Sequence, residues 1–192
     1  MNYLAHTFLA GENQKTIVGS FIADAIKGNH LDIYEKDIAL GVKLHRAIDQ
    51  FTDTNNIVQN SKKRLYGKYH KYAGVIVDMF YDHFLAKNWS DYSAIPLDET
   101  AHNTYGLILK HYSILPSKII RILPFMIYHN WFVSYADINK LKLHFEGMAR
   151  RTSFVSGMEN VTEDLRTDYN LYEKEFKLFF PLVIDFSKDY II

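Results

Sequence analysis

Apolar residues recur at helical spacing along almost the whole chain, with polar residues between them. Proline is rare, occurring only at Pro96, Pro116, Pro124 and Pro181, and the nine glycines are scattered. The sequence contains no internal repeat, low-complexity segment or linker. Since 192 residues suffice for one sizeable core, we expect an all-α, single-domain helical bundle over residues 1–192.

The pattern predicts where the helices begin and end. Gly11 and Gly28 are placed to end helices, and Asp37 and Asp137 to begin them. The last predicted helix is long and can kink at Pro181, whereas the aromatic segment 124–135 fits no clear pattern. The predicted helices cover residues 2–10, 16–27, 37–51, 57–66, 75–87, 98–112, 118–122, 137–150 and 161–190.

One predicted helix carries acidic residues in an apolar setting. Between Val75 and Leu85 the chain reads V-I-V-D-M-F-Y-D-H-F-L, without glycine or proline. Asp78 and Asp82 are four residues apart and therefore share one helical face. Two carboxylates among apolar side chains cost several kcal/mol unless a positive group lies between them. We expect that group to be a metal ion, an arginine or a proton.

Similar polar residues occur in three other predicted helices. They are His6, Asp24, and the pair His45 and Asp49, which are again four residues apart. Each has a simpler interpretation when taken alone. A lone histidine such as His6 is more often a hydrogen-bonded core or surface residue. Asp24 can be a helix-end carboxylate, and Asp49 can pair with Arg46 or Lys43 on a solvated face.

Facing helices of a bundle can bring such side chains to one metal ion. The chain has no cysteine, so the ligands would be imidazole and carboxylate, which suit Mn, Fe, Mg or Zn. With open positions, such an ion binds a phosphate oxygen and lowers the pKa of a bound water. A purely structural polar cluster remains the alternative, because buried polar groups also occur without function.

Charge and motifs restrict the partners. The formal net charge is zero, so nothing global favours nucleic acid or an anionic membrane. The chain has no apolar run of about 18 residues or more, so no membrane span is predicted. We expect a soluble, cytoplasmic protein. Glycine-rich nucleotide-binding motifs are absent. Arg150 and Arg151 can bind phosphate. One stretch of the chain is basic and is either a solvated helix face or a docking site for an acidic partner. Its basic residues are Lys62, Lys63, Arg64, Lys68 and Lys71.

Several motifs occur together and in order. They are M-N-Y-L-A-H at 1–6, G-S-F-I-A-D-A-I-K-G at 19–28, L-H-R-A-I-D-Q-F-T-D at 44–53, D-M-F-Y-D-H-F-L-A at 78–86 and G-M-A-R-R at 147–151, with the Trp131 region between the last two. This set resembles the acyl carrier protein phosphodiesterase (ACP hydrolase) family through at least residues 1–151. The resemblance implies an atypical, helical member of the HD phosphatase/phosphodiesterase superfamily.

The resemblance also implies an activity. Such an enzyme, a phosphoric diester hydrolase, is metal-dependent, with Mn²⁺ favoured. It cleaves the phosphodiester between 4′-phosphopantetheine and a serine of holo-acyl carrier protein, giving the apo carrier and 4′-phosphopantetheine. Acyl carrier proteins are generally acidic, so the basic stretch between Lys62 and Lys71 becomes a candidate docking surface.

The polar positions of the helices and the resemblance together give the candidate site residues. We expect Asp24, His45, Asp78 and Asp82 to be metal ligands, with His83 a further one. The HD pattern has a His-Asp doublet, whereas this chain has the reverse order at Asp82 and His83. The remaining candidates are Asp49 as a ligand or as the group orienting His45, His6 for proton transfer and Arg46 for phosphate contact.

The sequence leaves two other hypotheses about function open. The first is an HD-like phosphohydrolase that acts on a nucleotide or another small phosphoester. The second is a non-enzymatic helical module that binds an acidic protein. The first keeps the metal and changes the substrate, whereas the second predicts no metal at all.

Overall fold

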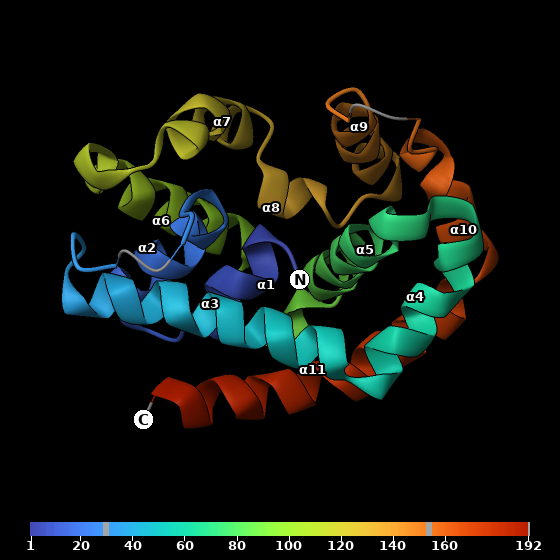
Figure 1. The fold of residues 1–192 in the computed structure, drawn as a ribbon, viewed down its shortest axis with the longest axis horizontal. Helices are drawn as coiled ribbons and strands as arrows, with labels where there is room; N and C mark the ends of the chain where they lie inside the picture. Colours follow the sequence, from blue (N-terminus) through green and yellow to red (C-terminus); the bar gives the residue numbers. More distant parts are fainter. Residues whose placement is uncertain (29–30, 153–154, 192) are drawn as a thin grey trace.

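The structure, a computed structural model, describes residues 1–28, 31–152 and 155–191. In these ranges every regular element is a helix, which confirms the predicted all-α fold class (Figure 1). The longer helices are α1 (Tyr3–Leu9), α2 (Gln14–Ile22), α3 (Lys36–Thr54), α4 (Asn56–Tyr69), α5 (Ala73–Lys87), α6 (Leu97–Lys110), α7 (Ser117–Tyr128), α8 (Trp131–Ser134), α9 (Ile138–Ala149), α10 (Val161–Thr167) and α11 (Tyr169–Ile191). Short 3₁₀ turns join them: η1 (Ala23–Ala25), η2 (His70–Tyr72), η3 (Trp89–Asp91), η4 (Tyr112–Ile114) and η5 (Met158–Asn160).

Three predicted helices differ clearly in extent from the observed ones. The helix expected at 16–27 begins at Gln14 and ends at Ile22, where the 3₁₀ turn η1 follows, and Asp37 lies in the first turn of α3, whose N-cap is Glu35. The helix expected at 118–122 continues as α7 to Tyr128 and has Pro124 inside it. Burial of Ile119, Leu123 and Met126 along one face stabilises α7 beyond the proline, although proline removes a helical hydrogen bond. The single helix expected at 161–190 is two helices, α10 and α11, which meet at Asp168.

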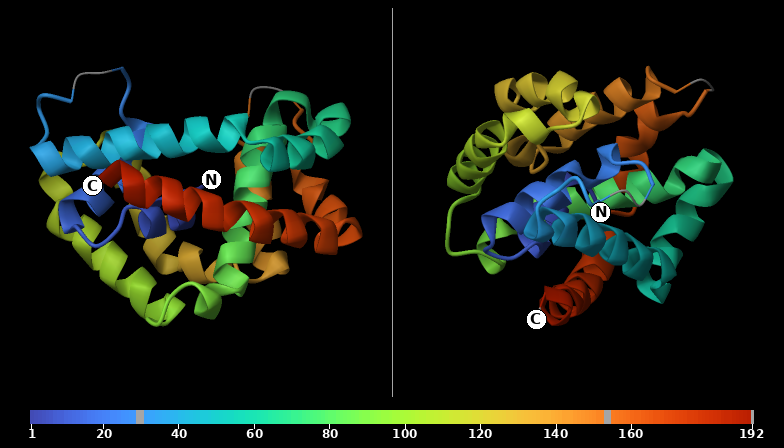
Figure 2. Two further views of the ribbon diagram at one scale, coloured as in Figure 1. Left: turned by 90° about the horizontal axis from the view of Figure 1, so that it is seen from below. Right: turned by 60° about the vertical axis from the view of Figure 1, so that its left-hand side comes forward.

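The hydrophobic core is built around α5. This helix contacts α1, α4 and α11, and most of its residues are buried. α11 supplies buried aromatic residues, among them Phe176, Phe179 and Phe180, and runs along one side of the molecule (Figure 2). None of the described helices is both long enough and apolar enough to cross a membrane.

α2 and α3 pack unusually close to one another. A Cβ atom placed on Gly19 would lie 2.0 Å from the carbonyl oxygen of Ile38, and one on Gly41 would lie 2.1 Å from that of Thr16. Neither distance can be accommodated, so only glycine fits at this crossing. The close approach places Ser20 of α2 against His45, one turn beyond Gly41 on α3.

The start of α1 is fixed by a carboxylate from α5. Asp82 is fully buried, and its two oxygens accept the backbone N–H groups of Asn2 and Leu4 at 3.1 and 3.0 Å. These amides belong to the N-cap and the first turn of α1, where no carbonyl of the helix itself is available to them. Asp82 therefore anchors the helix that carries His6.

Candidate active site

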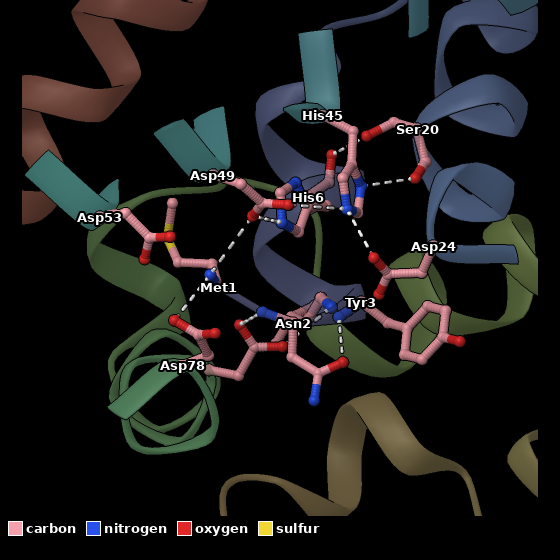
Figure 3. A network of polar contacts seen from close by, with 12 residues as sticks. Met1, Asn2, Tyr3, His6, Ser20, Asp24, His45, Asp49, Asp53 and Asp78 are labelled. Carbon is pink, nitrogen blue, oxygen red and sulfur yellow. Dashed lines mark hydrogen bonds and ion pairs between the residues drawn. The ribbon is translucent and has the colours of Figure 1, made fainter. Parts of the chain in front are cut away.

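Two helices and one 3₁₀ turn bring a cluster of histidines and carboxylates together (Figure 3). His6 comes from α1, Asp24 from η1, and His45 and Asp49 from α3. One potential ligand atom from each of His6, His45 and Asp49 lies within 4.8 Å of the other two. This trio, together with Asp24, is referred to below as the His–Asp cluster.

The two histidines of the cluster stack on each other. Their ring centroids are 3.5 Å apart and the ring planes differ by 13°. Both side chains are buried, whereas the side chains of Asp24 and Asp49 are 54% and 41% exposed. The imidazoles are thus buried, and the carboxylates lie partly at the surface.

Asp49 joins the two rings. Its Oδ1 lies 3.0 Å from Nε2 of His6, and its Oδ2 lies 3.3 Å from Nε2 of His45. Asp24 Oδ1 is also 3.3 Å from Nε2 of His45. One ring nitrogen therefore faces two carboxylates at once, an arrangement that requires a cation, either a proton or a metal ion.

The orientation of the His45 ring is set from its other side. Nδ1 of His45 lies 2.8 Å from the carbonyl oxygen of Ser20, an oxygen that can only accept a hydrogen bond. Nδ1 therefore carries the hydrogen, and in the neutral ring the lone pair is on Nε2, toward Asp24 and Asp49. Sequence reasoning did not single out Ser20, and its place within the G-S-F motif was the only available signal.

The pKa values of the two stacked histidines are shifted in opposite directions. Burial lowers the pKa of His45, but the hydrogen bonds that its ring donates to Asp24 and Asp49 outweigh this effect and raise the pKa to about 9. Burial, followed by the charge on His45, lowers the pKa of His6 to about 4. Burial raises the pKa of Asp49, but its hydrogen bonds with both histidines bring it below the usual range. The cluster thus concentrates one positive charge at His45.

Asp78 and Asp82 lie beside this cluster, but they contact the first residues of the chain. The amino group of Met1 is 2.9 Å from Asp78 Oδ1 and 3.9 Å from Asp49 Oδ1. Burial raises the pKa of Asp78, against the effect of that amino group, and raises the pKa of Asp82 to about 7. From the sequence we expect a metal ion, an arginine or a proton beside these carboxylates, and the structure places the amino group of Met1 beside Asp78. The role of Asp78 and Asp82 as metal ligands stays a prediction.

The structure does not bring His83 into the cluster. Its Nδ1 lies 2.7 Å from the carbonyl oxygen of Tyr135, and its Nε2 lies 2.8 Å from the hydroxyl of Tyr169. Both ring nitrogens are therefore engaged elsewhere in the core. Adjacent residues of a helix point about 100° apart, so Asp82 and His83 face different neighbours.

Arg46 also faces away from His45, its neighbour on α3. Its guanidinium donates hydrogen bonds to the carbonyl oxygens of Ile26 and Gly28, at 3.1 and 2.8 Å. These contacts hold the segment that follows Asp24. The predicted contact between Arg46 and phosphate stays a prediction.

The fold and the cluster define a class: an all-α protein with a histidine–carboxylate cluster whose donor atoms are compatible with a divalent metal ion. Comparison with known families is more specific. The family model for acyl carrier protein phosphodiesterase matches residues 1–183, and the chain belongs to this family. The resemblance seen in the sequence, and the prediction of a hydrolase, are confirmed at the level of the family.

Similar proteins cover the chain from end to end. The acyl carrier protein phosphodiesterase of Photorhabdus laumondii is 29% identical over 188 residues, covering 96% of this chain and 94% of the relative. Those of Yersinia enterocolitica and Escherichia coli O6:H1 are 26% and 27% identical, and each alignment covers at least 96% of both chains. No solved structure was found to match the chain. The HD-like character of the fold therefore stays a prediction.

Proposed function

We propose that this protein is a metal-dependent phosphodiesterase that removes 4′-phosphopantetheine from holo-acyl carrier protein. The bond cleaved is the phosphodiester to the carrier serine, and the products are the apo carrier and 4′-phosphopantetheine. The observation that carries the proposal is the family match over residues 1–183, in a chain whose His–Asp cluster suits a metal. The proposed site of action is the cytoplasm, as expected from the sequence.

The donor set of the His–Asp cluster fits a divalent metal such as Mn²⁺. Imidazole nitrogen and carboxylate oxygen are ligands typical of Mn, Fe and Zn. His45 presents Nε2 while its Nδ1–H is held by a backbone carbonyl, the usual arrangement for a ligating histidine. Among the described residues, the buried Nδ1 of His6 has no hydrogen-bond partner. We propose His6, His45, Asp49 and Asp24 as the residues that hold the ion.

The proposed ligands and the residues that position them have distinct roles in the proposed reaction. A bound ion would polarise the phosphodiester and lower the pKa of a water molecule. Ser20 holds the His45 ring in the binding orientation, and Asp49 links the two histidines. Asp82 fixes the start of α1 and so the position of His6. His6 lies within the trio, and we therefore propose it as a ligand in place of the predicted proton-transfer role.

Intact-mass measurement of the carrier tests this proposal. Holo-acyl carrier protein is incubated with the enzyme and Mn²⁺, and we expect its mass to fall by one phosphopantetheine group. A chelator in excess should stop the conversion, and added Mn²⁺ should restore it. A carrier that keeps its prosthetic group with Mn²⁺, Fe²⁺, Zn²⁺ and Mg²⁺ would contradict the proposal.

A further inference from the structure

The basic segment predicted for docking has most of its charge compensated within the molecule. Lys62 pairs with Asp53, Arg64 with Glu175, and Lys68 with Asp164. Each of these cations would have to leave an acidic partner to bind an acidic protein. Three of the five predicted docking cations thus contribute little net attraction, and another surface is the better candidate.

The outer face of α7 offers such a surface. Lys118, Arg121, Phe125 and Tyr128 follow one another at spacings of three and four residues, so they form one stripe on the helix. All four are exposed, Phe125 by 62% and Tyr128 by 84%. The opposite face of the helix, with Leu123 at its centre, is buried. These four residues are called the α7 stripe.

The α7 stripe is positively charged without local compensation. α7 contains no aspartate or glutamate. In the described parts of the chain, Arg121 has no ion-pair partner, and Lys118 is bonded to a backbone oxygen and not to a carboxylate. Exposed aromatic rings next to uncompensated cations are the composition found at the energetic centres of protein interfaces.

The α7 stripe begins at the candidate active site. Nζ of Lys118 lies 3.4 Å from the carbonyl oxygen of Asp24, whose carboxylate faces His45. α7 packs against η1, the turn that carries Asp24. From there the stripe extends about 15 Å along the helix, since each residue advances about 1.5 Å. A protein lying on it would have one end beside the His–Asp cluster.

We infer that the α7 stripe is the docking surface for the acidic carrier protein, an inference that rests on the proposed function. Charge complementarity selects this occupant, because an acidic helix laid along α7 would pair with Lys118 and Arg121. Phe125 and Tyr128 would contact its apolar side chains, as in other helix-mediated contacts. The modified serine of the carrier would then lie at the Asp24 end.

A matched pair of double variants tests the inference. One is Arg121→Glu with Phe125→Ser. The other is Lys63→Glu with Tyr66→Ser, which lies in the predicted docking segment and replaces an exposed lysine and an aromatic ring that is 63% exposed. The readout is the Kd for a fluorescently labelled apo carrier protein, which does not depend on catalysis. Circular dichroism confirms that both variants are folded.

We expect the α7 variant to bind the carrier at least about tenfold more weakly, which is a loss of about 1.4 kcal/mol. The affinity of the wild type should fall with added salt, and the Lys63/Tyr66 variant should remain within about twofold of it. The inference is overturned if the Lys63/Tyr66 variant loses affinity and the α7 variant does not, or if the wild-type protein does not bind the carrier.

A second copy of this chain is the other possible occupant. If sedimentation shows a wild-type dimer that the α7 substitutions dissociate, the stripe is a dimer interface and the inference is wrong. Failure of the proposed function can be distinguished from failure of the docking inference. In that case the carrier binds to the wild-type protein but keeps its phosphopantetheine. If the α7 variant releases phosphopantetheine with an unchanged KM for the carrier, the docking surface is wrong and the proposed function stands.

Discussion

Nδ1 of His45 donates a hydrogen bond to the carbonyl oxygen of Ser20, and this contact decides which ring nitrogen faces the carboxylates. The carbonyl belongs to α2 and the ring to α3, so the contact depends on how closely these helices approach. Gly19 and Gly41 allow that approach, and the geometry of the His–Asp cluster follows from it.

Gly41→Ala should therefore damage both the fold and the site. Its Cβ would lie 2.1 Å from the carbonyl oxygen of Thr16, a backbone atom that cannot move independently. We expect a loss of roughly 1–3 kcal/mol or more in the free energy of unfolding, as for other overpacked sites. Urea denaturation measures this loss.

The matched control is Gly67→Ala on α4. A Cβ at Gly67 meets no atom within 4 Å, so alanine should leave the stability unchanged or raise it by up to about 1 kcal/mol, as expected for glycine in a helix. Equal stability of the two variants would show that the glycine contact between α2 and α3 does not constrain the structure.

The variant Asp82→Ala distinguishes two roles of the Asp82 carboxylate, which are anchoring α1 and binding a metal ion. If Asp82 anchors α1, the variant leaves the amides of Asn2 and Leu4 without their acceptor, and unfolding becomes easier by roughly 1–3 kcal/mol. Asp82→Asn keeps one acceptor oxygen and should lose less. Asp185→Ala, an exposed carboxylate on α11, should change little. Loss of metal binding at full stability would instead identify Asp82 as a ligand.

His144, on α9, predicts a pH dependence of stability. Its Nε2 lies 2.8 Å from Oγ of Ser134, and burial, followed by the charges of His129 and Arg151, lowers its pKa from 6.5 to about 4. Between those values the unfolded chain binds more protons than the folded one, so stability falls as the pH falls. The full effect is about 3 kcal/mol.

Urea titrations at pH 7 and pH 4 measure the contribution of His144. The wild type should lose stability between these values, and His144→Gln should lose less, because glutamine cannot bind the proton. His102→Gln, on the exposed face of α6, serves as the control and should behave as the wild type does. An unchanged pH dependence in His144→Gln would refute this explanation.

Local patterns predicted much of the fold. The Asn2–Ala10 and Asp137 signals correspond to α1 and α9, and the side chain of Asp137 accepts the N–H of Asn139 at the start of α9. Local propensity was insufficient at α7, where buried contacts from distant parts of the chain outweigh the effect of Pro124. The break at Asp168 was missed for a similar reason, because apolar spacing continues on both sides of it.

The candidate site shows the same limit. Apolar neighbours in the sequence led us to expect a metal ion, an arginine or a proton beside Asp78 and Asp82. Asp82 is buried and Asp78 partly so, and their neighbours are the Met1 amino group for Asp78 and two backbone amides for Asp82. The group itself, the N-terminal segment, could not be predicted, since it comes from about 80 residues away. His6 was a candidate for proton transfer, but its place in the trio could not be predicted locally, because its partners, His45 and Asp49, come from another helix.

Metal content after dialysis against Mn²⁺ tests the central claim most directly. His45→Ala and His83→Gln form a matched comparison, because both replace a histidine that is at most 5% exposed. We predict that the wild type and His83→Gln retain stoichiometric metal and that His45→Ala loses it, with all three folded by circular dichroism. Retention by His45→Ala, or loss by His83→Gln, would contradict a metal site at the His–Asp cluster.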